Sequence, residues 1–167
     1  MILTDNQQAA LTTNKRQTEE LWKTLKIIGD KELTQNKLNY INHGPYTRGE
    51  LPQLLIDNDI DLVISVGGDG TFSEVMNGNL ERNKKIVLAH LPVGTTNDIG
   101  HMYGLGNNLY TNLKLILEGT IKKVDVGLIN NHAFTYVASY GKFMDIPYKT
   151  PQELKRRLGY LAYMLEV

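Results

Sequence analysis

Three glycines and an aspartate near the middle of the chain have the types and spacing of a phosphate-binding turn. An apolar run, Ile60–Val66, leads into Gly-Gly-Asp-Gly-Thr, and a short amphipathic segment follows. Glycines leave backbone N–H groups open to an approaching anion, and a helix start adds the positive end of its dipole. The pattern therefore predicts a strand, a turn and a helix N-terminus that bind phosphate through the backbone of Gly67, Gly68 and Gly70 and the hydroxyl of Thr71.

A second polar turn, Gly94–Asp98, follows the next apolar run, Ile86–Leu91. If both runs are parallel strands, both turns lie at the carboxyl edge of one sheet, where ligands of open α/β sheets bind. Asp69 and Asp98 would repel a bare phosphate, so they favour a magnesium ion that bridges carboxylates, water and phosphates. The alternative for either turn alone is an aspartate that only bonds local backbone.

The segments that must position these turns alternate between strand and helix patterns, which is typical of a layered α/β domain with a parallel sheet. Strands are expected over Met1–Thr4, Leu38–Asn42, Ile60–Val66 and Ile86–Leu91, and helices over Lys15–Ile28, Arg48–Asp57, a segment from the capping box Thr71-x-x-Glu74 to Asn77-Gly78, and Asn108–Glu118.

The period of the pattern changes after Gly119. Lys122–Ile129 alternates as a strand, Asn130-Asn131 can form a tight hairpin turn, and Ala133–Ala138 returns as its partner. A last helix is expected from the capping box Thr150-Pro151-Gln152-Glu153. We therefore expect an α/β domain over residues 1–122 and the truncated start of a mainly β second domain over residues 123–167.

Composition excludes several classes of protein. Lys plus Arg and Asp plus Glu both number 18, so the net charge is zero and a nucleic-acid partner held by bulk charge is not expected. The absence of cysteine excludes disulfides and thiolate metal sites. The apolar runs are too short for a transmembrane segment, and no secretory signal opens the chain, so the expected compartment is the cytoplasm.

Several motifs together resemble the diacylglycerol kinase catalytic domain, in particular the soluble bacterial diacylglycerol and lipid kinases that are related to sphingosine kinases. The resemblance runs from about Ile60 to the end of the chain. The glycine motif alone is shared with NAD kinases, whereas the later motifs select the lipid-kinase branch. The motifs are Gly-Gly-Asp-Gly-Thr at 67–71, Glu-Val-x-Asn-Gly at 74–78, Leu-Pro-x-Gly-Thr-x-Asn-Asp at 91–98, Val-Asp-Val-Gly at 124–127, and Tyr148-x-Thr150-Pro151 with Lys155, Gly159, Tyr160, Ala162 and Tyr163.

The resemblance implies an NAD-kinase/diacylglycerol-kinase-like fold and transfer of the γ-phosphate of ATP to a lipid hydroxyl, with diacylglycerol as the first candidate and phosphatidic acid as its product. It implies magnesium near Asp69, Asp98 and Asp125. The nucleotide contacts that it implies are Gly67, Gly68, Asp69, Gly70, Thr71, Phe72, Ser73, Thr95 and Asn97. It places the general base beyond Val167, so the chain is expected to be an inactive fragment. The lipid would be met at the inner face of the membrane; the sequence leaves a homodimer open.

One part of the sequence departs from this family. The family's first strand leads into an Asn-Pro-x-Ser-Gly turn, and we place the corresponding turn at Asp5–Ala9, which lacks its proline and glycine. Two alternatives therefore stay open: a kinase of a soluble acceptor such as NAD, and a non-catalytic nucleotide-binding module. His90, within an apolar strand, is interpreted as a hydrogen-bonded core histidine.

Overall fold

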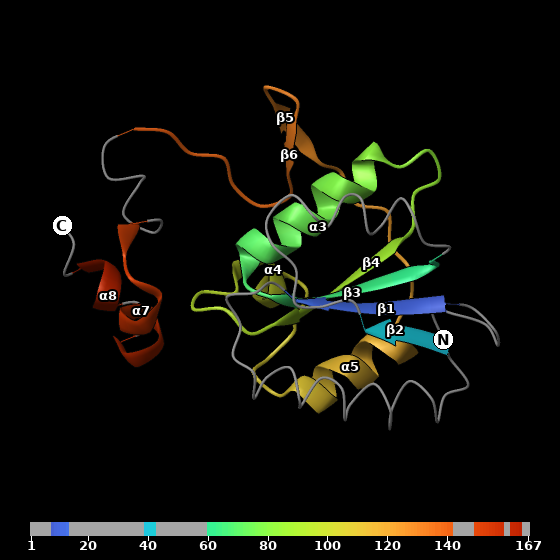
Figure 1. Cartoon of the computed structure of the whole chain (residues 1–167), viewed down its shortest axis with the longest axis horizontal. Helices are drawn as coiled ribbons and strands as arrows, with labels where there is room; N and C mark the ends of the chain where they lie inside the picture. The colour runs from blue at the N-terminus through green and yellow to red at the C-terminus, as the bar shows by residue number, and fades with distance from the viewer. Residues whose placement is uncertain (1–7, 14–38, 43–59, 142–148, 159–160, 165–167) are drawn as a thin grey trace.

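A parallel sheet forms the centre of the computed structural model, which describes residues 8–13, 39–42, 60–141, 149–158 and 161–164 (Figure 1). Its order in the described residues is β2-β1-β3-β4. The strands are β1 (Gln8–Thr13), β2 (Asn39–Asn42), β3 (Leu62–Gly67) and β4 (Val87–Pro92). The α/β class with a parallel sheet is thus confirmed.

The register brings the ends of β3 and β4 to one edge of the sheet. Gly67 pairs with Pro92, and the N–H of Val93 donates to the Gly67 carbonyl at 2.8 Å, so the ladder continues one step past β4. The turns that follow the two strands therefore leave the sheet side by side. All six residues of β3 are buried, as expected of a strand covered on both faces.

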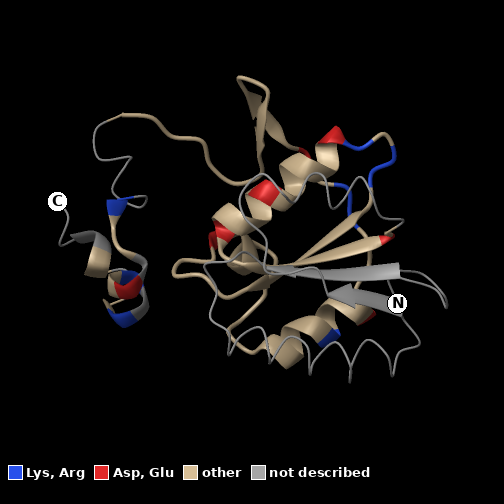
Figure 2. Ribbon diagram, in the orientation of Figure 1, with Lys and Arg blue, Asp and Glu red and all other residues tan. Residues whose placement is uncertain are grey.

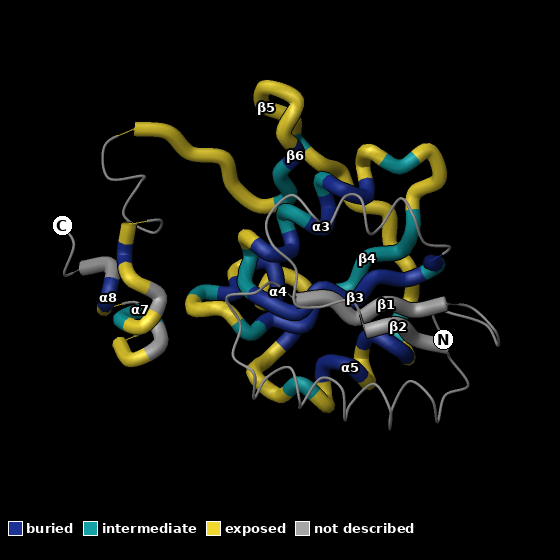
Figure 3. The backbone as a smooth tube through the Cα atoms, viewed as in Figure 1, coloured by how far each residue is buried: buried dark blue, intermediate teal, exposed yellow. Residues whose placement is uncertain are grey.

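Helices cover both faces of the sheet. Figure 1 shows α3 (Asp69–Glu81) and α5 (Leu109–Glu118) on opposite sides of it, and Figure 3 shows that both helices contain buried residues. The cluster under α3 contains Ile60, Val63 and Val75. The larger cluster under α5 contains Leu62, Ile64, Val66, Leu91, Leu113, Ile116 and Leu117.

The segment after α5 leads to an antiparallel hairpin of β5 (Gly127–Ile129) and β6 (His132–Phe134). Asn130 and Asn131 adopt positive φ angles of 49° and 62°, as the sequence predicted for a tight turn. Two helices follow in the described residues, α7 (Gln152–Leu158) and α8 (Leu161–Met164).

The N-terminal prediction was wrong in one respect. Residues 5–9 were expected to form the turn after a first strand, but Gln8 and Ala9 already lie in β1. The signal was weak because Ala9 and Ala10 are small and Thr12 and Thr13 are polar, so the segment lacks the apolar run of a buried strand. The expected strand Met1–Thr4 and the helices Lys15–Ile28 and Arg48–Asp57 lie outside the described residues, whereas β2 confirms the strand at 38–42.

Other boundaries also differ. The helix expected between Thr71 and Asn77-Gly78 begins earlier and continues to Glu81, because the asparagine side chains at 77 and 79 have partners outside the helix. A short helix, α4 (Asp98–Met102), was not expected. The strands predicted over 122–129 and 133–138 shorten to three residues each; residues 121–126 are exposed and have no strand pairing.

Candidate functional site

The two polar turns touch each other through their glycines. A Cβ atom added to Gly94 would lie 2.5 Å from the Cα of Gly68, and one added to Gly68 would lie 3.2 Å from the Cα of Gly94. Only residues without a side chain allow two backbones to approach this closely. The structure thus brings the two predicted turns into direct contact at the carboxyl edge of β3 and β4.

Asp69 links the two turns by hydrogen bonds. Its Oδ1 accepts from the N–H of Ile99 at 2.8 Å, and its Oδ2 accepts from the N–H of Asp98 at 3.2 Å. The Thr96 hydroxyl lies 3.4 Å from the same Oδ2. A carboxylate is stabilised at a helix N-terminus, where N–H groups lack partners within the helix. Asp69 therefore caps α4 from the other turn.

Asn97 explains why α4 needs a cap from elsewhere. It is the N-cap residue of α4, in the left-handed conformation with φ 55°, but its side chain makes no cap hydrogen bond. Instead, its Oδ1 accepts from the Gly94 N–H at 2.7 Å and its Nδ2 donates to the Gly94 carbonyl at 2.9 Å. The side chain thus closes the second turn on itself, and Asp69 supplies the acceptor that α4 lacks.

The start of α3 presents backbone donors at this edge. Its N-cap is Gly68, and no side chain caps it, so the expected capping box of Thr71 and Glu74 was wrong. The N–H groups of Thr71 and Phe72 both donate to the Gly68 carbonyl. Gly70 is exposed, and no atom lies within 4 Å of the position a Cβ would take there. The first turn of α3 is thus accessible from solvent at Gly70, where an anion would meet it.

Of the other expected contacts, Phe72 is buried and its ring centroid lies 5.0 Å from that of His90, whereas Thr95 is exposed. Ser73 lies one turn into α3, where its carbonyl accepts from Asn77. His90 is a buried core histidine, as expected, with Nδ1 3.2 Å from the Ser65 carbonyl. Burial lowers the pKa of His90 from its ordinary value, although this hydrogen bond and the charge of Asp69 act in the opposite direction.

The expected metal ligands do not form one cluster. Asp98 and Asp125 are exposed, and Asp125 lies before β5 in the segment without regular structure. Within the part of the chain that the structure describes, no three His, Asp or Glu side chains lie close enough to hold a metal ion. The magnesium ligands therefore stay a prediction.

The edge that carries the turns has no basic side chain of its own. Residues 67–73 and 94–98 contain neither Lys nor Arg. Figure 2 shows the basic residues of the described chain elsewhere, among them Arg82, Lys84 and Lys85 in the loop between α3 and β4. Positive potential at this edge therefore comes, among the described residues, from backbone N–H groups at helix starts.

Three asparagine side chains, none of them predicted as functional, each bond both the N–H and the C=O of one other residue. Asn77 contacts both the N–H and the C=O of Ala133, and Asn79 contacts both groups of Ile86. Asn112 does the same with Gly106. Their partners are set by the fold, so the sequence offers only one signal: an Asn-Gly-Asn run within a helix.

Comparison with known proteins identifies the family. The family model described as the diacylglycerol kinase catalytic domain matches residues 6–129. The chain belongs to this family. A diacylglycerol kinase from Staphylococcus epidermidis is 37% identical over 111 residues, and one from Staphylococcus aureus is 39% identical over 106 residues.

A solved structure of a diacylglycerol kinase from Bacillus anthracis has a TM-score of 0.67 and 26% identity to this chain. The match covers 96% of this chain and 53% of that one. The Staphylococcus matches cover 66% and 64% of this chain but only 35% and 34% of the relatives. The chain thus spans about a third of the length of these curated relatives. None of the helices in the described segments is long and apolar enough to cross a membrane.

Proposed function

We propose that this chain is the nucleotide-binding part of an ATP-dependent lipid kinase, which transfers the γ-phosphate to a lipid hydroxyl. Diacylglycerol is the proposed acceptor and phosphatidic acid the product, since the curated relatives are named diacylglycerol kinases. The observation that carries the nucleotide part is the close approach of Gly68 and Gly94, which joins the two polar turns at one sheet edge.

The phosphates of the nucleotide would lie against the first turn of α3. The N–H groups at the start of an uncapped helix and the dipole of α3 favour negative charge at Gly68–Thr71. The exposed Thr95 adds a hydroxyl from the second turn, and Asn97 holds that turn in shape through Gly94. Phosphoryl transfer depends mostly on such positioning and on charge stabilisation.

The acidic residues fit a divalent cation that arrives with the nucleotide. Magnesium commonly takes one or two protein carboxylates, with phosphates and water as its other ligands, so a cluster of three acidic side chains is not required. We propose that Asp98 is a direct ligand because its side chain is exposed beside the turns. Asp69 would act through the lone pairs that are not used by the N–H groups of α4. Asp125 is proposed as a further ligand from the family resemblance alone. Bound magnesium supplies positive charge to the transferred phosphoryl group.

The residues proposed so far would bind the nucleotide and magnesium, not the lipid acceptor. We propose no residue of this chain as the general base. We propose that the chain alone binds nucleotide without turnover, and that the kinase containing it works in the cytoplasm at the inner face of the membrane, where its lipid substrate is found.

Two measurements test the proposed function. Isothermal titration of this chain with ADP and magnesium should show binding that Gly94→Ala removes; no binding to the unmodified chain would contradict the nucleotide site. A longer polypeptide that contains this sequence should phosphorylate diacylglycerol in mixed micelles in preference to NAD, with the Staphylococcus aureus relative as positive control. Preference for NAD would favour a soluble-acceptor kinase, and binding without any activity would favour a non-catalytic module.

A further inference from the structure

Asn77, in the third turn of α3, contacts a part of the chain that is remote in sequence. Its Nδ2 donates to the Ala133 carbonyl at 3.0 Å and to the Ser73 carbonyl at 2.8 Å, and its Oδ1 accepts from the Ala133 N–H at 2.8 Å. Because Ala133 offers one donor and one acceptor, these contacts fix the orientation of the amide. A single side chain therefore satisfies both peptide groups of a residue 56 positions away.

These contacts match the geometry of the hairpin. The turn Asn130-Asn131 joins the pair Ile129 and His132, and the next pair is Leu128 and Ala133. Hydrogen-bonded and non-hydrogen-bonded pairs alternate in an antiparallel ladder. Because Asn77 takes both peptide groups of Ala133, these groups point away from β5, and Asn77 occupies the place of a neighbouring strand at this position.

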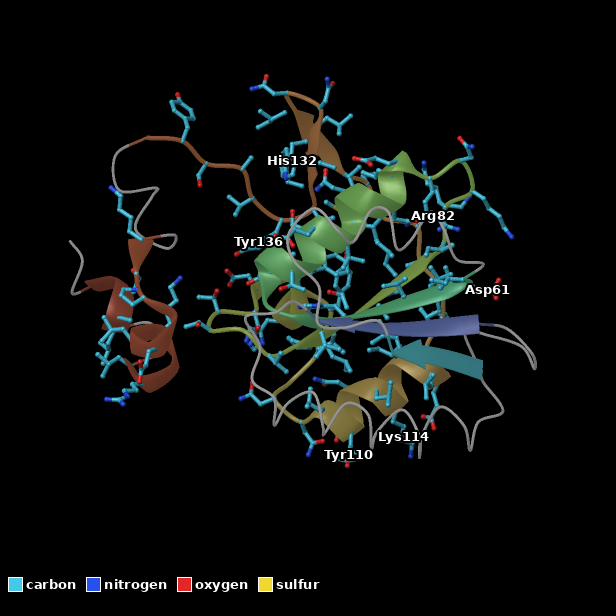
Figure 4. The ribbon with its side chains drawn as sticks, in the orientation of Figure 1. Asp61, Arg82, Tyr110, Lys114, His132 and Tyr136 are labelled. Carbon is cyan, nitrogen blue, oxygen red and sulfur yellow. The ribbon has the colours of Figure 1, made fainter. Side chains whose placement is uncertain are left out.

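Among the described helices and strands, α3 makes the main contact with the hairpin. A two-stranded hairpin alone is marginally stable in water. Leu128 and Ile129 are 67% and 52% exposed, whereas Ala133, at the contact with α3, is 1% exposed. Figure 4 labels His132 on the hairpin beside α3. The described hairpin is thus held from the side of α3.

The local sequence also indicates a specific role. Asn and Gly have low helix propensity, and Asn-Gly-Asn at 77–79 would be expected to end a helix. The helix nevertheless continues to Glu81, because Asn77 pairs with Ala133 and Asn79 pairs with Ile86. A residue that breaks a local rule and gains a tertiary partner is typical of a functional or architectural position.

We propose that Asn77 is a positioning residue. It fixes the β5–β6 hairpin on α3 and so sets the chain that follows the hairpin relative to the phosphate turn at the start of the same helix. The catalytic part of this inference rests on the proposed kinase function. In such a kinase the acceptor must be held close to the transferred phosphoryl group, and a displacement of about 1 Å can reduce the rate about 100-fold.

The first test is structural and needs no ligand. Asn77→Ala in this chain should accelerate hydrogen exchange of the Ala133 amide about 10-fold or more, as measured by NMR. Asn79→Ala is the matched control, because it removes the same kind of pair from the same helix but releases only the Ile86 peptide. Unchanged exchange at Ala133 in Asn77→Ala, or an equal change in Asn79→Ala, would overturn the docking role.

The second test is kinetic, in a kinase-active polypeptide that contains this sequence. Asn77→Ala should lower kcat about 10- to 100-fold with an unchanged KM for ATP, whereas Asn79→Ala should keep kcat within about 2-fold at a temperature where both variants are folded. An equal loss of kcat in both variants would reduce Asn77 to a purely structural role. If no such polypeptide phosphorylates a lipid, the proposed function fails, and the exchange experiment still decides whether Asn77 docks the hairpin.

Discussion

The carboxylate of Asp69 accepts a 2.8 Å hydrogen bond from the backbone N–H of Ile99, thirty residues further along the chain. The first turn thus supplies the cap of the helix that follows the second turn, and the charge of Asp69 is compensated before any ligand binds. This gives Asp69 a structural role beside the one proposed with magnesium. Because only Asp69 caps α4, substitutions of Asp69 and Asp98 should differ in their effect on stability.

Asp69→Ala should reduce both stability and nucleotide binding. Loss of a helix cap costs about 1–2 kcal/mol, so the free energy of unfolding should fall by about that amount. Affinity for ADP with magnesium should also fall at least 10-fold, because the two turns lose their link. Urea denaturation and isothermal titration measure the two effects.

Asp98→Ala provides the comparison for Asp69. The Asp98 side chain is exposed, and α4 uses its backbone N–H rather than its carboxylate, so the free energy of unfolding should change by less than about 0.5 kcal/mol. Magnesium-dependent nucleotide affinity should still fall. Equal stability losses in the two variants would contradict the capping role of Asp69, and unchanged affinity in both would contradict the proposed site.

Gly94→Ala tests the close approach of the turns. The added Cβ would lie 2.5 Å from the Cα of Gly68 and 2.9 Å from Oδ1 of Asn97, so backbone must move. Such overpacking costs about 1–3 kcal/mol, and separated turns should no longer bind nucleotide. Thermal unfolding with and without ADP checks both effects.

Gly106→Ala is the control for that substitution. No atom lies within 4 Å of the Cβ position there, and its φ angle is not in the left-handed region. The change should be neutral or stabilising by up to about 1 kcal/mol, with the thermal shift on ADP addition unchanged. If Gly94→Ala behaved like this control, contact between the turns would not matter for binding.

The sequence predicted the centre of the sheet well because its local signals agree. Ile60–Val66 and Ile86–Leu91 are apolar runs that end at glycine or proline, and β3 and β4 follow them within two residues. Asn108 was expected to open a helix, and it caps α5 by accepting from the Thr111 N–H at 3.0 Å. In these segments the pattern, the cap and the burial all favour the same structure.

The details of the site could not be predicted because they depend on tertiary partners. No residue near Asp69 in the sequence indicates that its carboxylate accepts a hydrogen bond from the Ile99 N–H. Thr71 and Glu74 have the residue types of a capping box, but the N-cap of α3 is Gly68. Asn77-Gly78 is typical of a helix end, and the tertiary contact of Asn77 with Ala133 explains why α3 continues past it. The alternating apolar and polar residues before β5 did not form a strand, because no described strand pairs with residues 121–126.

Asn97 combines a left-handed backbone with a side-chain contact to Gly94, and two variants separate these contributions. Asn97→Gly tolerates φ 55° but loses the contact, so it should cost about 1 kcal/mol of unfolding free energy. Asn97→Ala loses the contact and also places alanine in the left-handed conformation, which lowers the unfolding free energy by about 1–2 kcal/mol more. Equilibrium urea denaturation should rank the stabilities as Asn97, then Gly, then Ala. Equal stability of the two variants would show that the backbone conformation contributes nothing.

His90 makes stability depend on pH in a direction that follows from its burial. Because burial lowers its pKa in the folded protein, the unfolded chain binds more protons below the ordinary pKa of 6.5. Its contribution to stability is therefore complete above pH 6.5 and decreases as the pH falls from 6.5 toward the folded pKa. His90→Leu, which cannot titrate, should show a smaller loss of unfolding free energy between pH 7.5 and about pH 5.

The test compares the pH dependence of unfolding in His90→Leu with that in the unmodified chain. Urea denaturation at closely spaced pH values measures the slopes, and the comparison concerns the slopes alone, since His90→Leu also loses the hydrogen bond to the Ser65 carbonyl. A His90→Leu curve parallel to that of the unmodified chain would show that this histidine keeps its ordinary pKa. A flatter curve would confirm that burial lowers the pKa of this histidine in the folded protein.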